Sequence, residues 1–412
     1  MRIGGAKNAA LPALAAALLT DEPVRLTDLP DVADLRTLRR LLEGMGVRVT
    51  GSAPGPMTLD ASGITSTEAP YNVVRTMRAS ILVLGPLVAR FGEAFVSLPG
   101  GCAIGERPVD LHIAALTTLG ARISVEKGYI NAHISRVGSS KGRLQGGTVS
   151  FSTVTVTGTE NVMMAAALAD GTTTIENAAR EPEVVDLAEL LLKMGARIQG
   201  AGTPTIVVEG VERLHGTGDD THPIVPDRIE AGTYLAAGAI SNGDVTVDNV
   251  RPAHLAAFLD ALRRAGVSVA ETPSTVRVSG APTGGVDVTT EPFPGFATDL
   301  QAQAMALLTQ APGLSRIHET IFENRFLHAA ELRRLGADIR LEGNTAIIAG
   351  GRRLQGAPVT ASDLRASAAL VLAGLAASGE TLVRRIYHLD RGYSGMEAKL
   401  AALGADVTRV SG

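Results

Sequence analysis

The chain has 412 residues, a formal net charge of −4, 45% hydrophobic residues and a single cysteine. This composition is typical of a globular protein of two or three domains, and it excludes a strongly basic nucleic-acid-binding surface, an internal disulfide and a metal site built from several cysteines. The longest apolar runs, such as 81–89 and 366–377, are too short to span a bilayer, and no signal-peptide core follows Met1, so we expect a cytoplasmic protein that binds neither nucleic acid nor membranes.

One sequence phrase recurs six times along the chain, with a period of about 70 residues. In each copy a leucine-containing helical run ends in glycine, followed by Ala or Val, one further residue, and Ile or Val. We expect the glycine to end a helix, and the alternating residues after it to form a strand. The six glycines are Gly46, Gly120, Gly195, Gly266, Gly336 and Gly404.

A second phrase recurs in the same rhythm and combines an Ala/Leu-rich run, a polar turn and an alternating strand. The runs carry few charges, so we expect helices that are buried nearly all round. Each unit is then a buried helix, a strand, a more polar helix and another strand, which predicts an α/β (α+β) fold with mixed sheets around central helices. Three units per domain give two domains, with the seam near 214–223 and a ligand site in the cleft between them. The copies are 11–29, 80–98, 162–177, 233–249, 302–320 and 367–386.

The starts of these buried helices are unusually polar. Helix N-termini favour anions, so Lys7, Arg78 and Arg365 oppose the helix dipole there, at a cost that a bound anion would offset. For the aspartates, threonines and asparagines at the same places, ordinary capping is the simpler interpretation. Thr298 and Gln301 have the spacing of a capping box.

The only cysteine, Cys102, lies in the stretch 98–112, together with three glycines and two prolines. That composition excludes a helix interior or a central strand and predicts a loop. Arg107 and Asp110 bring charges of both signs near the thiol, so the stretch is consistent with a lid that carries a reactive group. The competing interpretation is a surface turn with an incidental thiol.

Several phrases together resemble the bacterial UDP-N-acetylglucosamine 1-carboxyvinyltransferases, within the enolpyruvyl transferases. The match runs from Gly4 onward and is carried by 5–12, 76–80, 98–112, 296–299, 321–326, 363–367 and 390–393. The resemblance implies two domains, 8–216 and 217–412 plus 1–7, each of three βαβαββ units around a pseudo-threefold axis. The same fold serves 5-enolpyruvylshikimate-3-phosphate synthase, but the cysteine loop resembles the UDP-sugar enzymes.

The function implied by this resemblance is transfer of the enolpyruvyl group of phosphoenolpyruvate to the 3-hydroxyl of UDP-N-acetylglucosamine, with release of phosphate. This is the committed step of peptidoglycan synthesis. The expected partners are these two small molecules, with no cofactor and no metal; the sequence does not settle the oligomeric state. The reaction needs an acid for the methylene carbon and a base for the sugar hydroxyl.

The resemblance assigns the acid to Cys102 and the base to Asp299, and places Lys7, Arg107 and Arg391 at the phosphate. A neutral thiol, which is the form that can donate a proton, fits the ordinary cysteine pKa of about 8.5. Arg325 and Arg365 are expected at the same anionic end, oriented by Asp363. Substrate binding is assigned to Lys7, Asn8, Arg78, Arg107, Pro108, Val109, Asp110, Leu111, Thr153, Val154, Thr155, Val156, Asp299, Ile321, Arg325, Asp363, Arg365 and Arg391.

Two departures and two other functions stay open at this point. Relative to the family, a short N-terminal strand segment is missing, which predicts an unpaired sheet edge, a less stable second domain or a misassigned start. The segment 393–396 is less charged than in the family, and Gly395 should loosen the following helix. His112 is either structural or a diphosphate-side residue. The alternative functions are a thiol hydrolase using Cys102 and a non-catalytic UDP-sugar-binding regulator.

Overall fold

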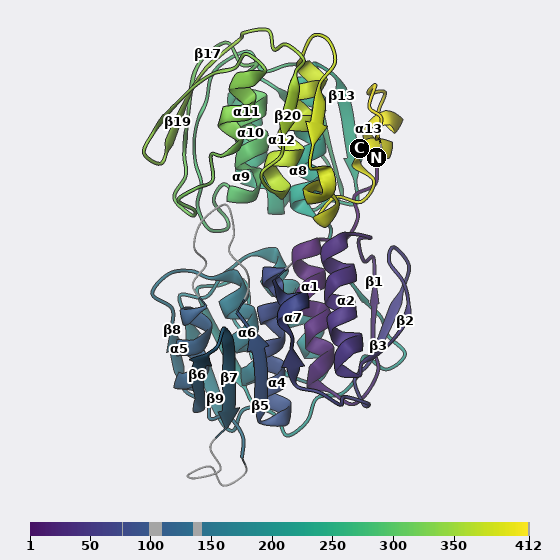
Figure 1. The fold of residues 1–412 in the computed structure, drawn as a ribbon, viewed down its shortest axis with the longest axis vertical. Helices are drawn as coiled ribbons and strands as arrows, with labels where there is room; N and C mark the ends of the chain where they lie inside the picture. The colour runs from purple at the N-terminus through teal and green to yellow at the C-terminus, as the bar shows by residue number, and fades with distance from the viewer. Residues whose placement is uncertain (76, 99–108, 135–141, 411–412) are drawn as a thin grey trace. The chain divides into compact units, whose positions relative to one another are not determined.

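The computed structural model describes residues 1–75, 77–98, 109–134 and 142–410, and these form two compact units. The N-terminal unit contains the described residues between 5 and 225, and the C-terminal unit contains 1–4 and 226–410. Each unit has its own hydrophobic core, and each combines helices with small mixed sheets (Figure 1). The predicted α/β class and the two-part organisation are therefore present.

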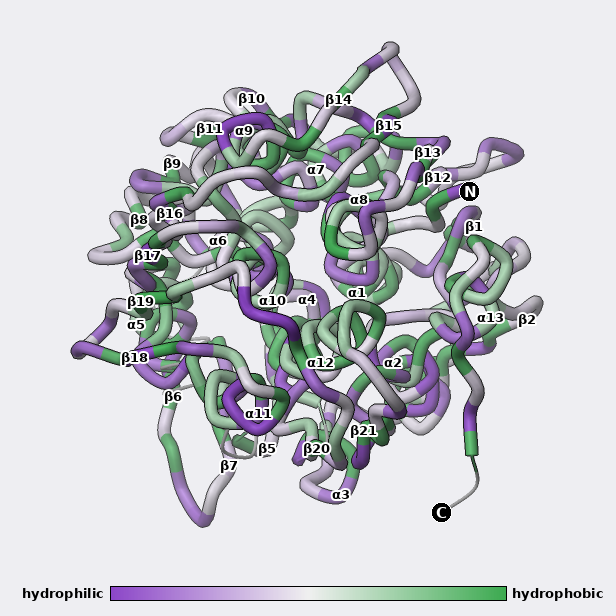
Figure 2. The backbone as a smooth tube through the Cα atoms, turned by 90° about the horizontal axis from the view of Figure 1, so that it is seen from above, coloured by the Kyte–Doolittle hydropathy of each residue, from purple (hydrophilic) through white to green (hydrophobic). Residues whose placement is uncertain are grey.

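Each unit has helices at its centre that are buried almost all round, as their low charge predicts. In α10 (Gln301–Leu308) every residue is buried, and in α8 (Arg228–Ile240) only the first residue is not. In the C-terminal unit α8, α10 and α12 (Leu364–Ala376) contact one another, and Figure 2 shows apolar residues recurring along their course. The corresponding helices of the N-terminal unit are α1 (Lys7–Ala16), α4 (Leu84–Phe91) and α6 (Val156–Ala166).

The second helix of each repeat ends where the glycine pattern predicts. All six glycines have φ between 85° and 104°, a backbone conformation that other residues adopt only with strain. The helices that they end are α2 (Ala33–Met45), α5 (Asp110–Thr118), α7 (Pro182–Lys193), α9 (Ala256–Arg264), α11 (His328–Arg334) and α13 (Met396–Ala402). Shorter helical segments are η1 (Ala17–Leu19), α3 (Tyr71–Val74), η2 (Arg78–Val83), η3 (Pro252–Leu255), η4 (Thr298–Leu300) and η5 (Ile386–Arg391).

The described residues of the N-terminal unit form three four-stranded sheets. Each combines parallel and antiparallel pairs; β1, for example, pairs with β12 in parallel and with β3 in antiparallel orientation. The first sheet has the order β12 (His222–Pro223), β1 (Val24–Thr27), β3 (Met57–Asp60), β2 (Arg48–Gly51). The second is β4 (Glu68–Ala69), β5 (Glu93–Ser97), β7 (Tyr129–Ile134), β6 (Ala121–Glu126), and the third β10 (Arg197–Gln199), β11 (Thr205–Glu209), β9 (Thr172–Glu176), β8 (Thr148–Ser150).

The sheets of the C-terminal unit follow the same plan but are less complete. The prediction of a strand after each helix-ending glycine is wrong for Gly404, because residues 405–410 form no strand. The sheets have the orders β13 (Asp244–Asp248), β15 (Thr275–Ser279), β14 (Ser268–Glu271); β16 (Asp287–Thr289), β17 (Gly313–His318), β19 (Thr345–Gly350), β18 (Asp338–Glu342); and β20 (Pro358–Thr360), β21 (Leu382–Arg384).

The first residues of the chain pair along β13. The Ile3 N–H donates to the Asp248 carbonyl at 2.9 Å, and the Asp248 N–H donates to the Met1 carbonyl at 2.7 Å. Arg2 and Asp248 form a parallel bridge. This stretch of the β13 edge is therefore paired.

The units divide between Gly4 and Gly5 and between Val225 and Pro226. The sequence placed these divisions after 7 and after 216. Two contacts account for the difference at the second position: His222–Pro223 pairs with β1, and the Val225 N–H donates to Asp186 at 3.0 Å. Both contacts attach residues 217–225 to the N-terminal unit.

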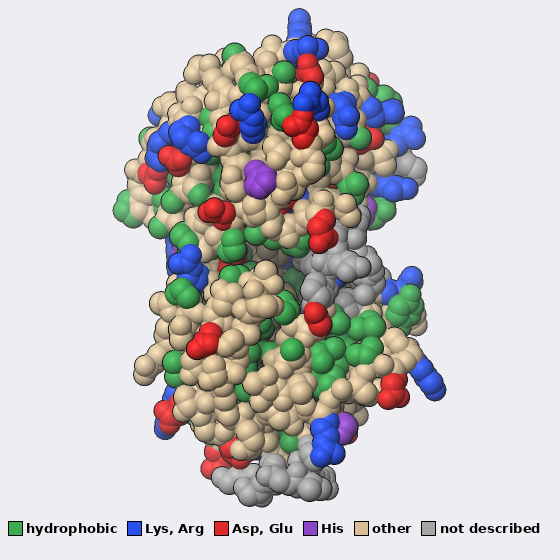
Figure 3. Space-filling model, turned by 90° about the vertical axis from the view of Figure 1, so that its left-hand side faces the viewer, with side chains coloured by type: hydrophobic (Ala, Val, Ile, Leu, Met, Phe, Trp, Pro, Cys, Tyr) green, Lys and Arg blue, Asp and Glu red, His purple; other side chains and the backbone are tan. Residues whose placement is uncertain are grey.

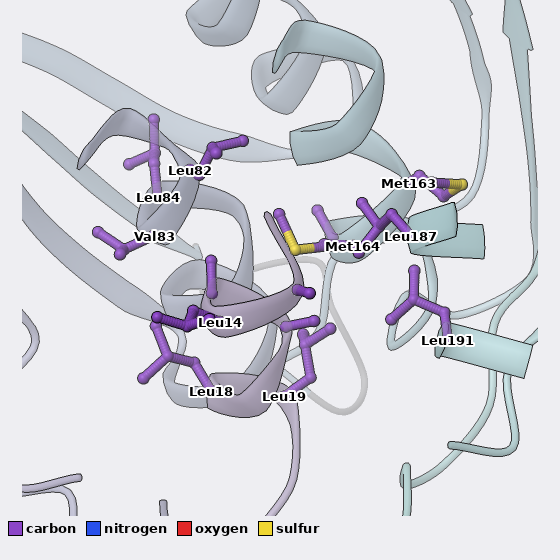
Figure 4. Close-up of a cluster of buried hydrophobic side chains, with 14 of the residues drawn as sticks. Leu14, Leu18, Leu19, Leu82, Val83, Leu84, Met163, Met164, Leu187 and Leu191 are labelled. Atoms are coloured by element: carbon purple, nitrogen blue, oxygen red, sulfur yellow. The ribbon is translucent and has the colours of Figure 1, made fainter. Parts of the chain in front are cut away.

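The core of the N-terminal unit forms where its central helices meet α7. Figure 4 shows Met164 of α6 between Leu14 of α1 and Leu187 of α7, with Met163 and Leu191 on the side away from Leu14. These side chains are almost fully buried. Burying a leucine or methionine stabilises a fold by about 1.5–3 kcal/mol, so this packing holds the helix starts in place.

On the face shown in Figure 3, basic and acidic side chains are interspersed over the surface. Exposed ion pairs of the C-terminal unit include Arg316–Asp287 and Arg352–Asp338. A search of the described part of the chain found no helix with the length and apolar character that crossing a membrane requires.

Candidate active site

Asp299 lies between two arginines in the C-terminal unit. Its Oδ1 accepts a hydrogen bond from Arg325 Nη2 at 2.8 Å, and its Oδ2 accepts one from Arg365 Nη2 at 2.7 Å. Charge-assisted bonds of this length are about twice as strong as neutral ones. Three residues far apart in the sequence, each predicted as a site residue, are therefore brought together by the fold.

The two arginines are buried, whereas the carboxylate that they hold is partly exposed. The side chains of Arg325 and Arg365 are 3% and 6% exposed, whereas that of Asp299 is 25% exposed. A carboxylate has about four lone-pair positions, and the two arginines occupy two of them. The partly exposed carboxylate of Asp299 can therefore accept a proton from a ligand while the arginines fix its orientation.

Arg365 is placed by the start of α12. The Asp363 Oδ1 accepts hydrogen bonds from the N–H groups of Arg365 and Ala366, at 2.9 and 3.0 Å, and so caps the helix. Burial raises the pKa of Asp363, but the Ala366 N–H and the Arg325 charge outweigh this and leave the pKa below its ordinary value. Asp363 thus stays ionised and orients Arg365 through its backbone, while Asp299 holds the guanidinium.

Arg325 lies against Phe322, with its Cζ 5.2 Å from the ring centroid, and its Nε lacks a hydrogen-bond partner among the described residues. His328, on α11, is also buried. Burial lowers the pKa of His328 to about 4, with Asp363 acting in the opposite direction and Arg325 adding to the shift. The imidazole is therefore neutral near pH 7, and Asp363 carries the negative charge beside Arg325.

Glu319 organises this site, although the sequence reasoning did not single it out. Its Oε2 accepts a hydrogen bond from the Thr298 hydroxyl at 2.9 Å, and its Oε1 accepts from the Ile321 N–H at 2.9 Å. The predicted capping box is wrong, because Thr298 lies inside η4 and its hydroxyl binds Glu319. Glu319 thereby joins the segment that carries Asp299 to the one that carries Ile321. Its position two residues before Ile321 was the only signal in the sequence.

In the N-terminal unit, Asn161 joins the segments expected to bind the nucleotide. Its Oδ1 accepts from the Gly85 N–H at 2.6 Å, which fixes the amide so that Nδ2 donates to the Ile81 carbonyl at 2.8 Å and to His112 Nδ1 at 3.0 Å. The His112 proton then lies on Nε2, which is 3.4 Å from the Thr157 hydroxyl. His112 therefore connects α5 to α6.

This connection holds two predicted segments close to each other. Val109 precedes α5, whose first turn contains Asp110 and Leu111, while Thr153–Val156 lead into α6. The Thr155 hydroxyl caps α6 by accepting from the Gly158 N–H at 3.2 Å. Asp110 and Thr153 are exposed at these helix starts.

Lys7 is the first residue of α1, as predicted, and its Nζ lies 3.2 Å from Asp34 of α2. Asn8 follows it in the same helix, and Arg78 is the first residue of η2, which packs against α1. All three side chains are partly exposed. The fold therefore places these helix starts near one another within the N-terminal unit.

The structure gives less information on the remaining residues predicted from the sequence. Arg391 is the last residue of η5, which packs against α12, and it is partly exposed. Gly395 has φ of 57° and directly precedes α13, so the helix begins there. Cys102, Arg107 and Pro108 lie outside the described residues.

Comparison with known proteins identifies the family. The family described as EPSP synthase (3-phosphoshikimate 1-carboxyvinyltransferase) matches residues 1–400. The chain belongs to the EPSP synthase family. A UDP-N-acetylglucosamine 1-carboxyvinyltransferase of Magnetococcus marinus is 54% identical over 411 residues, which cover 99% of this chain and 96% of that protein.

Solved structures of the same family share the fold. The enolpyruvyl transferase NikO from Streptomyces tendae superposes with a TM-score of 0.86 at 27% identity, covering 98% of this chain and 94% of that one. EPSP synthase from Acinetobacter baumannii gives a TM-score of 0.73 at 17% identity, covering 98% and 95%. The chain is thus an enolpyruvyl transferase with the two-domain fold predicted from its repeats.

Proposed function

We propose that this enolpyruvyl transferase moves the enolpyruvyl group of phosphoenolpyruvate to the 3-hydroxyl of UDP-N-acetylglucosamine and releases phosphate. The observation that carries the proposal is the partly exposed carboxylate of Asp299, held by two buried arginines. The 54% identity to the Magnetococcus marinus enzyme, over nearly the whole of both chains, supports the choice of acceptor. The reaction would be cytoplasmic and would commit the sugar to peptidoglycan synthesis.

In the addition step Asp299 accepts the proton of the sugar 3-hydroxyl, and the oxygen attacks C2 of phosphoenolpyruvate. Cys102 donates a proton to C3, the methylene carbon, so that the double bond is consumed and a tetrahedral adduct forms. In the elimination step the Cys102 thiolate takes a proton from C3, the bond from C2 to the phosphate oxygen breaks, the double bond re-forms, and Asp299 gives its proton to the departing phosphate. The products are phosphate and the enolpyruvyl ether, and both protein groups return to their starting protonation states.

The other site residues bind the reactants. Lys7, Arg107 and Arg391 neutralise the phosphate. Pairing its negative charge makes the phosphate a better leaving group. Arg325 and Arg365 hold Asp299 and contribute positive charge at the anionic end of phosphoenolpyruvate. The nucleotide sugar binds Asn8 and Arg78, the backbone of 107–111, the segment 153–156, and Ile321.

Phosphate release tests the proposal. With phosphoenolpyruvate alone or UDP-N-acetylglucosamine alone we expect none, and with both together we expect steady turnover. Release with shikimate 3-phosphate as the acceptor instead would assign the chain to the other activity of its family. Hydrolysis without an acceptor would favour the thiol hydrolase.

The role of Cys102 can be tested separately by exchanging its proton donor. Cys102→Ser should nearly abolish turnover, because the hydroxyl is a poor acid, whereas Cys102→Asp should retain part of it. Equal loss in both variants would contradict the assignment of Cys102 as the general acid. Binding of UDP-N-acetylglucosamine without any turnover in the parent chain would favour the non-catalytic regulator.

A further inference from the structure

Tyr393 lies at the meeting point of the three central helices of the C-terminal unit. It follows η5, and its hydroxyl contacts one polar side chain from each helix: Thr233 of α8 at 2.9 Å, Gln303 of α10 at 3.2 Å and Arg365 of α12 at 3.2 Å. The Arg365 Cζ lies 5.6 Å from the centroid of the Tyr393 ring. Tyr393 is 2% exposed, and Thr233 and Gln303 are fully buried.

The hydrogen bonds around this hydroxyl have a determined direction. The Thr233 hydroxyl donates to the Ile229 carbonyl at 2.7 Å, so its oxygen must accept from Tyr393. Gln303 Nε2 donates both to Thr233, at 3.0 Å, and to Tyr393. The Tyr393 proton therefore faces Thr233, and its lone pairs face Arg365 and Gln303. Burial raises the pKa of Tyr393, so the phenol keeps this proton.

This arrangement restrains the guanidinium through its second terminal nitrogen, the one that does not bind Asp299. Arg365 Nη1 donates to Tyr393 and Arg365 Nη2 donates to Asp299, so rotation of the planar group would break both bonds at once. We propose that Tyr393, supported by Thr233 and Gln303, is a positioning residue. It fixes the orientation of the Arg365 guanidinium, which in turn holds the Asp299 carboxylate in position for the substrates. This inference rests on the proposed function of Asp299 and Arg365.

The chain offers a matched control for removing this hydroxyl. Tyr234 is a second buried tyrosine of the same unit, and its hydroxyl has no hydrogen-bond partner among the described residues. Tyr393→Phe should lower kcat at least tenfold, because hydrogen bonds to charged groups are the strong ones, while Tyr234→Phe should change kcat less than twofold. The KM for phosphoenolpyruvate should rise in Tyr393→Phe. The KM for UDP-N-acetylglucosamine should stay within twofold, because the nucleotide contacts are proposed mainly in the N-terminal unit.

A second pair of variants tests the support behind Tyr393 and guards against a folding defect in Tyr393→Phe. Thr233→Val removes the acceptor for the Tyr393 proton and should lower kcat several-fold, whereas Thr233→Ser keeps the hydroxyl and should restore it. A purely structural role would move both KM values and the melting temperature together, and the serine variant would then give no selective recovery of kcat.

A readout that needs no activity separates this inference from the proposed function. The Nη signals of Arg365, observed by ¹⁵N NMR and assigned with Arg365→Lys, should be separate in the parent and in Tyr234→Phe, and should merge in Tyr393→Phe as rotation becomes fast. If the parent releases no phosphate, the proposed function fails, and the NMR signals still decide the restraint. If the parent is active but Tyr393→Phe matches Tyr234→Phe in kcat and in the Arg365 signals, the inference is overturned.

Discussion

Two polar groups at the central helices, one in each unit, differ in charge. In the C-terminal unit the residues are charged and compensate one another, as in the Asp299, Arg325 and Arg365 group. In the N-terminal unit the group around Asn161 is neutral: Asn161 and His112 bond each other, and burial lowers the pKa of His112 to about 4. The same repeat therefore holds a charged group around Asp299 in one unit and an uncharged group around Asn161 in the other.

Glu160 is a further buried polar residue of the N-terminal unit, next to Asn161 in α6. It is 1% exposed, and its Oε1 has no hydrogen-bond partner among the described residues. Burial raises its pKa well above the ordinary value, and the charges of Glu183, Glu181 and Asp186 add to the shift. These surroundings favour the protonated carboxyl of Glu160, whereas those of Asp363 in the other unit favour the carboxylate.

The largest effect should come from breaking the charged group. Asp299→Asn removes the negative charge that both buried arginines share, so we expect kcat to fall by about 10³-fold or more and the melting temperature to drop. Steady-state phosphate release and thermal unfolding measure the two effects. Asp244→Asn is the control, because Asp244 forms an exposed pair with Arg277 and its replacement should leave kcat unchanged. An active Asp299→Asn variant would exclude Asp299 as the base.

Breaking the neutral group should cost stability and leave no charge unpaired. Asn161→Leu removes the partners of the Gly85 N–H, the Ile81 carbonyl and His112 Nδ1, so we expect a loss of about 3–5 kcal/mol in the free energy of unfolding. Urea unfolding measures it. Asn161→Asp keeps an acceptor for Gly85 and should lose less; equal losses would show that this bond contributes little.

His112 makes the stability of the N-terminal unit depend on pH. Its pKa is about 4 when folded and about 6.5 when unfolded, so the unfolded chain binds the additional proton between these values. The contribution is present above pH 6.5 and is lost as the pH falls to 4, by about 3 kcal/mol. His112→Asn should flatten this dependence in unfolding measured from pH 7.5 to 4.5, while the exposed His133 replaced by Asn should not. Part of the pH dependence of stability should remain in His112→Asn, because burial also lowers the pKa of His328.

The smallest effect is expected at Glu160, where the dependence of stability on pH has the opposite sign to that of His112. Its raised pKa means that the folded chain holds a proton which the unfolded chain releases, so this contribution is lost as the pH rises above 4.5. Glu160→Gln keeps the shape without the titration. We expect its melting temperature to exceed that of the parent by a few degrees at pH 8 and to match it at pH 5. A lower melting temperature at pH 8 would indicate that the carboxylate is needed there.

The repeats made most of the fold predictable, because each depends on local chemistry. Gly46, Gly336 and their four equivalents can end helices because glycine tolerates positive φ, and the Ala/Leu runs must be buried. The strand expected after Gly404 does not form, because an alternating pattern also needs a neighbouring strand to pair with.

The site was predictable only in part. Lys7, Arg78 and Arg365 stood out because cations at helix starts are unfavourable, and the phrases resembling the family supplied Asp299 and Arg325. Glu319 did not stand out, and Asn161 did so only as part of the polar helix start 157–161, because their importance lies in bonds to residues distant in the sequence, such as Thr298 and Gly85. Such contacts have no local pattern, so only the folded chain reveals them.

The proposed function is tested most directly by identifying the bond that C2 of phosphoenolpyruvate forms. The chain should be incubated with ¹³C2-labelled phosphoenolpyruvate, UDP-N-acetylglucosamine and shikimate 3-phosphate together, and the products followed by NMR. We expect the labelled carbon to become an enol ether attached to O3 of the amino sugar, with phosphate released in equal amount. Label attached to shikimate 3-phosphate, or found as free pyruvate, would contradict the account.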